Sequence, residues 1–409
     1  MAGYAKGLVQ QPAHEARHVA VAPQRHDERM FMPDEDRVMR RIVGSLLCLI
    51  AFGLADIAGW PASHASSQRV EPGDTVVLVT LDGARTEEVF GGLDLEVLKS
   101  TLKPDAKVED SAVYKKYWAD TPEARRRKIL PFFWTLVTEQ GSIAGNRALD
   151  SRSTLGNKHW FSYPGYSEIL LGQAFDDDIK SNDPIRQPRE TVLERLKVKG
   201  HLTPAQVATF ASWDVFNAIA EHSVGATTIN AGTEPLDLDG DEVRIMNRLQ
   251  TEAASPWGNT RLDAFTFRQA MAYLEKVRPR VLYLAFDETD DWAHDGRYDK
   301  VLDTYARLDG YLRELWTWLQ AQPDYRGRTH LLITTDHGRG ATPADWRHHG
   351  DKYPGAEFTW MAFVSPKMAQ RGEWKNAPPI STSQAAATLA SWVDVDWNAD
   401  HPQAGKPIR

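Results

Sequence analysis

The apolar and polar residues of this chain alternate between two kinds of segment from Asp74 onward. Short runs rich in β-branched and aromatic residues have the length of buried strands, at 75–81, 207–211, 280–286, 329–335 and 357–365. Between them lie amphipathic stretches such as 299–320, where apolar residues recur at helical spacing. This alternation predicts an α/β fold with a mostly parallel central sheet and helices on both faces.

The first 65 residues have a different pattern. Two arginines follow Met39, then come an apolar run from Ile42 to Ala55 and small residues around Ala65, which is the layout of a secretory signal. The run is short for a membrane span, which needs about 20 residues. An uncleaved signal anchor is the alternative, because residues 56–60 lengthen the segment.

These features divide the chain into three parts. Because a signal normally begins at the N-terminus, we expect Met39 to be the true start and residues 1–38 to be a non-native or disordered extension. Residues 39–65 are then a signal peptide, and residues 66–409 form one large α/β domain with inserted loops. We therefore predict a periplasmic or secreted protein without a stable membrane anchor.

Composition excludes some functions. The chain has 409 residues, 42% hydrophobic and 25% charged, which is ordinary for a globular protein with a large core. Its net charge of −8 argues against a protein that neutralises phosphate backbones, so nucleic acid is not an expected partner. The only cysteine, Cys48, lies in the predicted signal, so any metal must be held by histidines and carboxylates.

Three predicted strands lead directly into acidic residues and histidines. The first strand ends at Asp82, the strand 280–286 leads into Asp287, Asp290 and His294, and the strand 329–335 ends at Asp336 and His337. Ligands of open α/β sheets bind at the carboxyl ends of the strands, so we expect these residues at one rim.

Each of these sequences alone has an ordinary structural explanation. Asp82 before a glycine suits a turn, Asp290 and His294 suit the start of a helix, and Asp336 and His337 suit a loop. Together, a mixed set of aspartates and histidines is typical of zinc ligands, and two zinc ions are the leading hypothesis.

Ser162 lies in the segment FSYPGYSEILLG. It precedes Pro164, a residue favoured in the first turn of a helix, so we expect the serine near a helix N-cap. Free backbone N–H groups and the helix dipole favour phosphate there. Simple capping is the more common use of such a serine. A zinc ion on its oxygen would instead favour the alkoxide and create a nucleophile.

The motifs TLDGAR, FSYPGYSEILLG, DETDDWAH, TTDHGRG and WRHHG, in this order, resemble the alkaline phosphatase superfamily, specifically its phosphodiesterase and nucleotide pyrophosphatase branch. The resemblance spans roughly residues 74–370 and implies an alkaline phosphatase-like catalytic domain. It also implies the ligands of two zinc ions, one held by Asp82, Ser162, Asp336 and His337 and the other by Asp290, His294 and His349. His348 is adjacent, but His349 directly precedes Gly350, as the family pattern requires.

The resemblance extends to the reaction. It implies an exported hydrolase of small-molecule phosphate mono- or diesters that works through a phosphoseryl intermediate on Ser162. Asn182 resembles the asparagine that holds a phosphate oxygen in diesterases, and its alternative is a turn residue. Four further acidic residues match no family position and are expected to tune charge or cap a helix: Asp287, Glu288, Asp291 and Asp295.

Departures from the family pattern bear on the alternatives. Sulfatases need an arginine two positions after the proline, and Tyr166 stands there, which makes a sulfatase the weaker hypothesis. A phosphate-clamping arginine has no clear match, so Arg85, Arg152 and Arg339 are candidates or surface charges. A phosphoglycerate mutase-like phosphotransferase and a non-catalytic metal-binding protein remain further alternatives. The leaving-group pocket is expected from loops 91–125 and 230–260.

Overall fold

The computed structural model describes residues 73–409, so the predicted extension (1–38) and signal (39–65) lie outside the described residues. The central sheet has eight strands. Their order is β10 (Gly372–Glu373), β2 (Ser142–Ala144), β9 (Met361–Val364), β7 (Thr329–Thr334), β1 (Thr75–Leu81), β6 (Val281–Phe286), β4 (Val207–Ala211) and β5 (Thr228–Ala231). Within this sheet β9 alone runs antiparallel to its neighbours, so the prediction of a mostly parallel sheet is confirmed.

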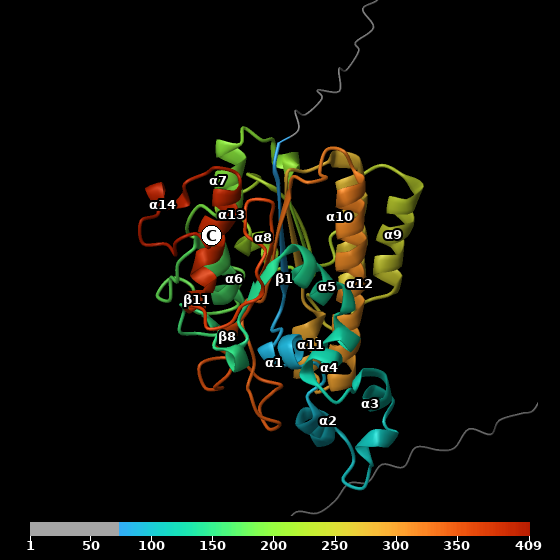
Figure 1. Ribbon diagram of the computed structural model, residues 1–409. Helices are drawn as coiled ribbons and strands as arrows, with labels where there is room; N and C mark the ends of the chain where they lie inside the picture. The colour runs from blue at the N-terminus through green and yellow to red at the C-terminus, as the bar shows by residue number, and fades with distance from the viewer. Residues whose placement is uncertain (1–72) are drawn as a thin grey trace, which may run out of the picture. The chain divides into compact units, whose positions relative to one another are not determined.

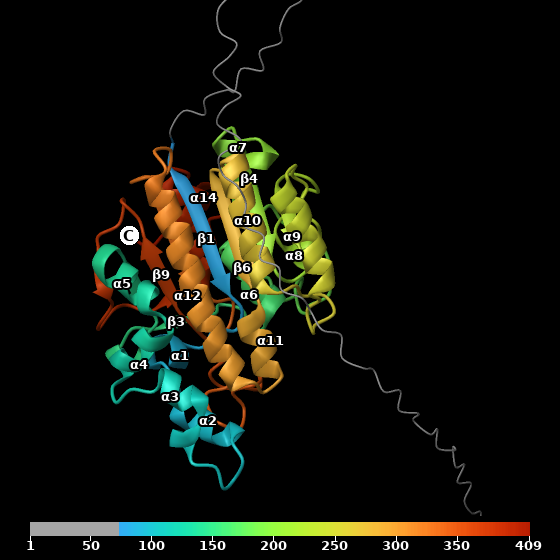
Figure 2. The same ribbon diagram turned by 90° about the vertical axis from the view of Figure 1, so that its right-hand side faces the viewer.

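Both faces of the sheet are covered. Successive strand residues point to opposite faces, so Val77 and Val79 of β1 enter one apolar core while Val76 and Leu78 enter the other. The first core includes residues of α5 (Pro131–Gln140), α10 (Asp263–Val277) and α12 (Tyr298–Ala321); the second includes residues of α6 (Ser162–Leu171), α7 (Val192–Lys199) and α13 (Ala385–Trp392). Figures 1 and 2 show these two layers of helices on either side of β1, which confirms the predicted α/β architecture.

Further helices and a small second sheet complete the described residues. The remaining helices are α1 (Thr86–Gly91), α2 (Leu95–Thr101), α3 (Ala112–Tyr117), α4 (Pro122–Ile129), α8 (Phe216–Ile219), α9 (Asp241–Glu252), α11 (Glu288–His294) and α14 (Trp397–Asp400). A second sheet has the order β11 (Ile380–Ser381), β3 (Ser153–Thr154) and β8 (Phe358–Thr359). None of the helices in residues 73–409 has both the length and the apolar character needed to cross a membrane.

One predicted strand is divided in two. The segment 357–365 forms β8 in the small sheet and β9 in the large one, with Trp360 between them. The buried indole of Trp360 donates to the carbonyl of Ala84 at 2.9 Å, and its own carbonyl accepts from the Thr334 hydroxyl at 2.6 Å. These bonds hold the chain where it changes sheets, in the loop region beside the end of β1.

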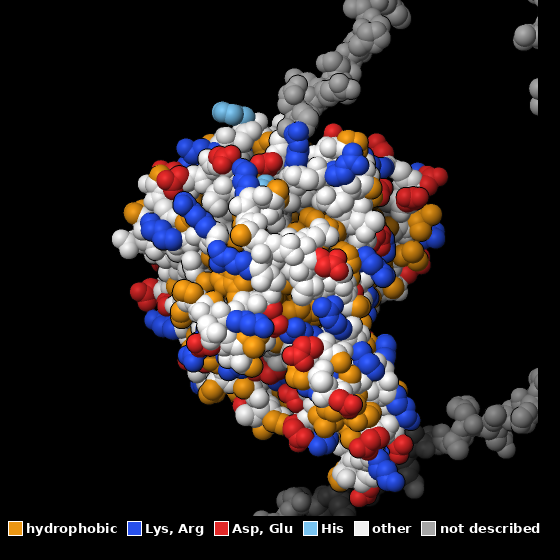
Figure 3. Space-filling view, in the orientation of Figure 1, with side chains coloured by type: hydrophobic (Ala, Val, Ile, Leu, Met, Phe, Trp, Pro, Cys, Tyr) orange, Lys and Arg blue, Asp and Glu red, His pale blue; other side chains and the backbone are white. Residues whose placement is uncertain are grey.

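The surface of the described residues mixes charges of both signs. Figure 3 shows basic and acidic side chains interspersed on the face that Figure 1 presents, with apolar side chains between them.

Candidate active site

The carboxyl ends of three neighbouring strands form the floor of the site. In the sheet β1 lies between β7 and β6, with Thr80 paired to Thr334 and Leu81 paired to Phe286. Because these strands are parallel and end at the same level, the residues that follow them meet at one rim. The predicted convergence of the three segments is therefore found in the structure.

The first group of side chains surrounds the Nε2 atom of His337. This atom lies 3.3 Å from Asp82 Oδ1, 3.4 Å from Asp336 Oδ2 and 3.3 Å from Ser162 Oγ. The Nδ1 atom of His337 lies 2.7 Å from the carbonyl of Gly338, which fixes the ring and leaves Nε2 facing the three oxygens. All four side chains belong to buried residues.

The two carboxylates of this group are only partly satisfied. Tyr166 donates its hydroxyl to Asp82 Oδ2 at 2.8 Å, and Gly83 donates its backbone N–H to Asp336 Oδ1 at 3.0 Å. The other oxygens, Asp82 Oδ1 and Asp336 Oδ2, are buried without a hydrogen-bond partner among residues 73–409. Buried carboxylate oxygens are costly unless a cation or metal pairs with them, so the group fits a bound metal ion.

The pKa values of the first group also indicate an excess of negative charge. Burial and the nearby Asp82 raise the pKa of Asp336 to about 8. Burial opposes the charged form of His337, but Asp336 and Asp82 outweigh it and raise the pKa of His337 to about 9. Without a metal ion, protons are therefore retained here to balance the carboxylates.

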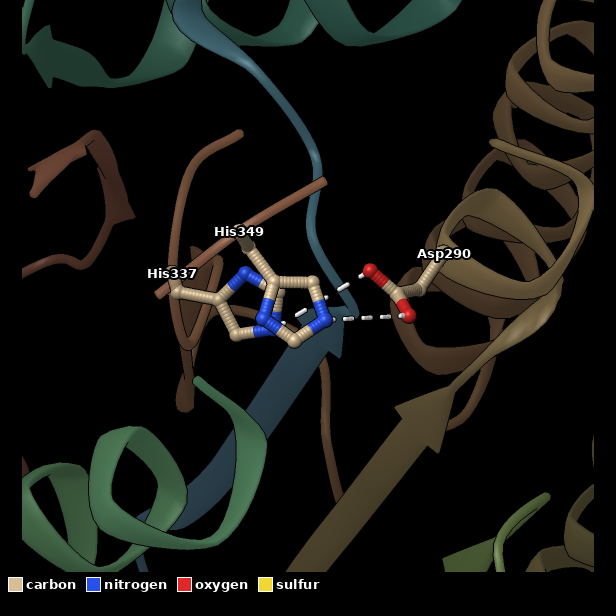
Figure 4. Close-up of side chains that lie close together, drawn as sticks. All are labelled: Asp290, His337 and His349. Atoms are coloured by element: carbon tan, nitrogen blue, oxygen red, sulfur yellow. Dashed lines mark ion pairs between the residues drawn. The ribbon is translucent and has the colours of Figure 1, made fainter. Parts of the chain in front are cut away.

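The second group adjoins the first. Asp290 and His294 lie one turn apart on α11 and share a face, with His294 Nε2 3.0 Å from Asp290 Oδ2. His349 Nε2 lies 2.9 Å from His294 Nε2 and 3.8 Å from Asp290 Oδ2. Figure 4 shows the side chains of Asp290, His337 and His349 pointing toward one another.

The second group also has the donor chemistry of a metal site. Burial, His337 and Arg339 hold the pKa of His349 well below its usual value, so its ring is neutral, as metal ligation requires. Among the described residues, two clusters have ligand atoms close enough to share a metal ion: Asp82 with Asp336 and His337, and Asp290 with His337 and His349. Both clusters contain His337, so the two groups form one continuous site. Neither cluster includes His294, which joins the second group through its contacts with Asp290 and His349.

The structure also separates His349 from its neighbour. His348 stacks on Tyr353 with ring centroids 5.2 Å apart, and neither metal-compatible cluster includes it. Gly350 donates its N–H to the carbonyl of Trp160 at 2.9 Å, which ties the loop carrying His349 to the segment before Ser162.

Ser162 does not cap α6, and the side chain of Asn182 accepts a hydrogen bond from the first turn of this helix instead. Phe161 is the N-cap residue of α6, and Ser162 is the first helical residue, with its hydroxyl directed at His337 rather than at the helix backbone. The amide oxygen of Asn182 accepts from the backbone N–H of Tyr163 at 3.0 Å. Simple capping therefore does not describe Ser162, and Asn182 is placed beside it.

Two glycines allow the backbone to approach the site closely. Gly83 has φ +56°, and a Cβ atom there would collide with the carboxylate of Asp290. A Cβ atom at Gly165 would collide with the backbone carbonyl of Asp336, so this glycine lets the start of α6 approach the end of β7.

The three candidate arginines differ from one another. Arg152 is exposed. Arg85 is buried, pairs with Glu88 and donates to the carbonyl of Gly340 at 3.2 Å. Arg339 is also buried and pairs with Asp290. The surface-charge alternative is therefore wrong for Arg85 and Arg339, because both are engaged inside the protein.

Sequence reasoning missed the residue that organises α11. Asp263, at the start of α10, accepts hydrogen bonds from the backbone N–H groups of Asp287 at 2.9 Å and Glu288 at 3.3 Å, and from Ser212 Oγ at 2.7 Å. Asp287 occupies the N-cap position of α11, but its side chain makes no capping bond. No local pattern points to Asp263, which lies far from α11 in the sequence.

An α/β sheet with Asp, His and Ser side chains at the carboxyl ends of its strands has the layout of a ligand site, and its donor atoms suit a metal-dependent hydrolase. A family model described as type I phosphodiesterase / nucleotide pyrophosphatase matches residues 190–395, half of the chain. The chain therefore belongs to this family. The match includes Asp290, His294, Asp336, His337 and His349, whereas Asp82, Ser162 and Asn182 precede it.

Solved structures with the same fold lie in the alkaline phosphatase superfamily. A mutant of the alkaline phosphatase PafA matches with 12% identity and a TM-score of 0.50, covering 82% of this chain and 98% of that one. The phosphonate monoester hydrolase SpPMH from Silicibacter pomeroyi has 12% identity and a TM-score of 0.50, covering 82% and 78%. The lipoteichoic acid synthase LtaP from Listeria monocytogenes has 10% identity and a TM-score of 0.50, covering 79% and 72%. No curated protein matches the sequence.

Proposed function

We propose that this chain is an exported phosphohydrolase that holds two zinc ions and cleaves phosphate mono- or diesters through a phosphoseryl intermediate on Ser162. The observation that carries the proposal is the position of Ser162 Oγ, 3.3 Å from His337 Nε2, beside two buried carboxylate oxygens without hydrogen-bond partners. A simple helix cap would not place a serine hydroxyl in such a group.

Each group of ligands would hold one ion. Asp82, Ser162, Asp336 and His337 would hold the first, and Asp290, His294 and His349 the second. Bound zinc would supply Lewis acidity, which favours the serine alkoxide at neutral pH and offsets charge on the leaving oxygen. The mixed oxygen and nitrogen ligands suit zinc better than a hard cation that prefers oxygen alone.

The residues of the chain then perform the displacement. Ser162 Oγ forms a bond to phosphorus while the ester bond to the leaving oxygen breaks, and the alcohol departs after gaining a proton. In the second step a water molecule attacks phosphorus, and the bond to Ser162 Oγ breaks. Each step inverts the configuration at phosphorus, so the overall reaction retains it.

Asn182 would hold the transferred group. The backbone N–H of Tyr163 can only donate, so the side-chain atom of Asn182 that faces it is the amide oxygen. The NH₂ group of Asn182 is therefore directed elsewhere. Asn182 is an exposed residue, and its NH₂ group is suited to donate to a non-bridging phosphate oxygen.

Tyr166 supports phosphate over sulfate as the substrate. This residue stands where sulfatases have the arginine of their formylglycine motif, and its hydroxyl is bonded to Asp82. We therefore propose that Ser162 stays unmodified and that phosphate esters react faster than the matching sulfate ester.

The test is substitution of the serine. Ser162→Ala should reduce kcat for an aryl phosphate ester by orders of magnitude, while the zinc affinity of the second group and substrate binding change little. Ser162→Thr should keep part of the activity. A chiral phosphate probe should show net retention. Net inversion, or a sulfate ester that reacts faster than both phosphate classes, would contradict the proposed reaction.

Export is tested separately. Cleavage after Ala65 predicts that the native protein begins near Ser66 and is found in the periplasm or the medium. N-terminal sequencing of native protein that returned Met1 would contradict this part of the proposal.

A further inference from the structure

Arg339 follows Asp336, His337 and Gly338 in the chain and contacts the second group of ligands. Its Nη1 atom pairs with Asp290 Oδ1. Its Nε atom donates to the carbonyl of Trp346 at 3.0 Å, and its Nη2 atom donates to the carbonyl of Arg347. The side chain is buried, so the protein itself fixes the guanidinium against Asp290.

This contact makes the two groups electrostatically unequal. In the first group a single histidine, His337, faces the inner oxygens of two carboxylates, 3.3 Å from Asp82 Oδ1 and 3.4 Å from Asp336 Oδ2. The second group has one carboxylate, and both of its oxygens are engaged, Oδ1 by Arg339 and Oδ2 by His294. The residues of the first group are at most 6% exposed, whereas the side chain of His294 is 41% exposed.

We propose that Arg339 is an internal counter-ion for Asp290 that competes with the second metal ion, so that the second ion binds more weakly than the first. The inference rests on the proposed two-ion site. A guanidinium and a divalent cation that share one carboxylate repel each other, and the repulsion is strong where water is excluded. When the ion is absent, the same guanidinium neutralises a charge that would otherwise repel Asp82 and Asp336.

Removing the charge should therefore have two opposite effects. Arg339→Met should make the metal-free protein less stable, because Asp290 loses its counter-ion. It should also tighten the second zinc ion by about tenfold or more, because the ion no longer competes with a fixed cation. Zinc should consequently raise the melting temperature of the variant more than that of the wild type.

The experiment compares four proteins stripped of metal and titrated with zinc by calorimetry, with melting temperatures measured before and after. They are the wild type, Arg339→Met, Arg339→Lys and Arg347→Met. Arg339→Lys keeps the charge and should retain a weak second site. Arg347→Met is the matched control for the loss of a nearby positive charge, because Arg347 lies in the same loop and donates to the backbone carbonyl of His294 at 2.7 Å, not to the Asp290 carboxylate.

We expect two zinc-binding steps of unequal affinity in the wild type. Only Arg339→Met should bind the second zinc ion more tightly. Loss or no change of the second step in that variant would overturn the inference and leave Arg339 a positioning residue. Equal affinities in the wild type would overturn it without any variant, even if Arg339→Met does not fold. If neither the wild type nor the variant binds a second ion, the two-ion proposal itself fails. A second ion in Arg339→Met alone would support the competition and contradict two-ion loading of the wild type.

Discussion

At the scale of single residues, the site depends on side chains that hold the proposed ligands in place. Tyr166 is buried, and burial together with Asp336 raises its pKa well above the usual value, so its hydroxyl remains a donor at neutral pH. Its bond to Asp82 Oδ2 leaves Oδ1 directed at His337. An orienting bond of this kind is typical of metal sites.

Tyr166→Phe should weaken the first zinc ion by about 10- to 100-fold, because Asp82 loses the bond that orients it while the ring volume is kept. Zinc titration of the metal-free variant measures this. Tyr163→Phe is the control, because the Tyr163 hydroxyl bonds to the carbonyl of Ile185 and touches no proposed ligand. Equal zinc affinity in the Tyr166 variant and the wild type would show that the bond has no orienting role.

Gly83→Ala should both destabilise the protein and disturb the site. A left-handed backbone at a non-glycine residue costs about 1–2 kcal/mol, and the added methyl group would collide with the Asp290 carboxylate. Chemical denaturation and zinc titration together report both effects. Gly91→Ala is the control, because a Cβ atom there meets nothing within 4 Å. A Gly83 variant as stable as the control would contradict the crowding seen in the structure.

The convergence of the proposed ligands at one rim was predictable from the sequence, but the partners of these residues were not. Asp82 directly follows β1, and Asp336 and His337 lie two and three residues after the end of β7, so the strand pattern alone indicates one rim. The bonds from Tyr166 to Asp82 and from Arg339 to Asp290 join residues 84 and 49 positions apart. Such pairs meet only through the three-dimensional packing of α6, α11 and the loop between β7 and β8. The spacing of residues along the sequence does not indicate them.

At the scale of elements, α11 depends on its surroundings. It has seven residues, too short to be stable alone, and it carries Asp290 and His294. Asp263 accepts from the first two N–H groups at its start, and Glu288 accepts from the Trp292 indole at 3.1 Å. A residue of α10 thus holds the start of α11 in place, and the sequence of α11 itself does not indicate this contact.

Asp263→Asn should cost about 1–3 kcal/mol of unfolding free energy, because an amide NH₂ cannot accept from the buried donors that now meet both carboxylate oxygens. Zinc should also bind less tightly at the second group, since α11 loses its anchor. Denaturation and zinc titration measure the two effects. The exposed Asp241 at the start of α9 provides the control Asp241→Asn. Unchanged stability together with unchanged zinc binding would contradict the anchoring role of Asp263.

Element boundaries were predictable where burial is continuous. The runs 75–81 and 207–211 coincide with β1 and β4, in which every residue is buried. The strand β5 was not predicted, because it is only four residues long and its first two positions are half-buried. The division of 357–365 into two strands depends on contacts of Trp360 with distant backbone, which no periodicity reveals.

At the scale of the whole molecule, the site joins elements from most of the described chain. The proposed ligands come from the ends of β1 and β7, from α6 and α11, and from the loop before β8. The alternation of strands and helices predicted this architecture, because a parallel sheet must collect the ends of its strands along one edge. Metal binding at that edge should therefore affect the stability of the fold as a unit.

Removal of metal should lower the melting temperature by several degrees and zinc should restore it. In the metal-free protein Asp82 and Asp336 are buried side by side, and an ion at about 100 times its Kd stabilises the native state by about 2.7 kcal/mol. Scanning calorimetry of chelated and zinc-reloaded protein measures the shift. The double variant Asp82→Asn, Asp336→Asn removes both carboxylate ligands of the first group, so its melting temperature should respond less to zinc. An equally large zinc response in the double variant would place the stabilising ion elsewhere in the protein.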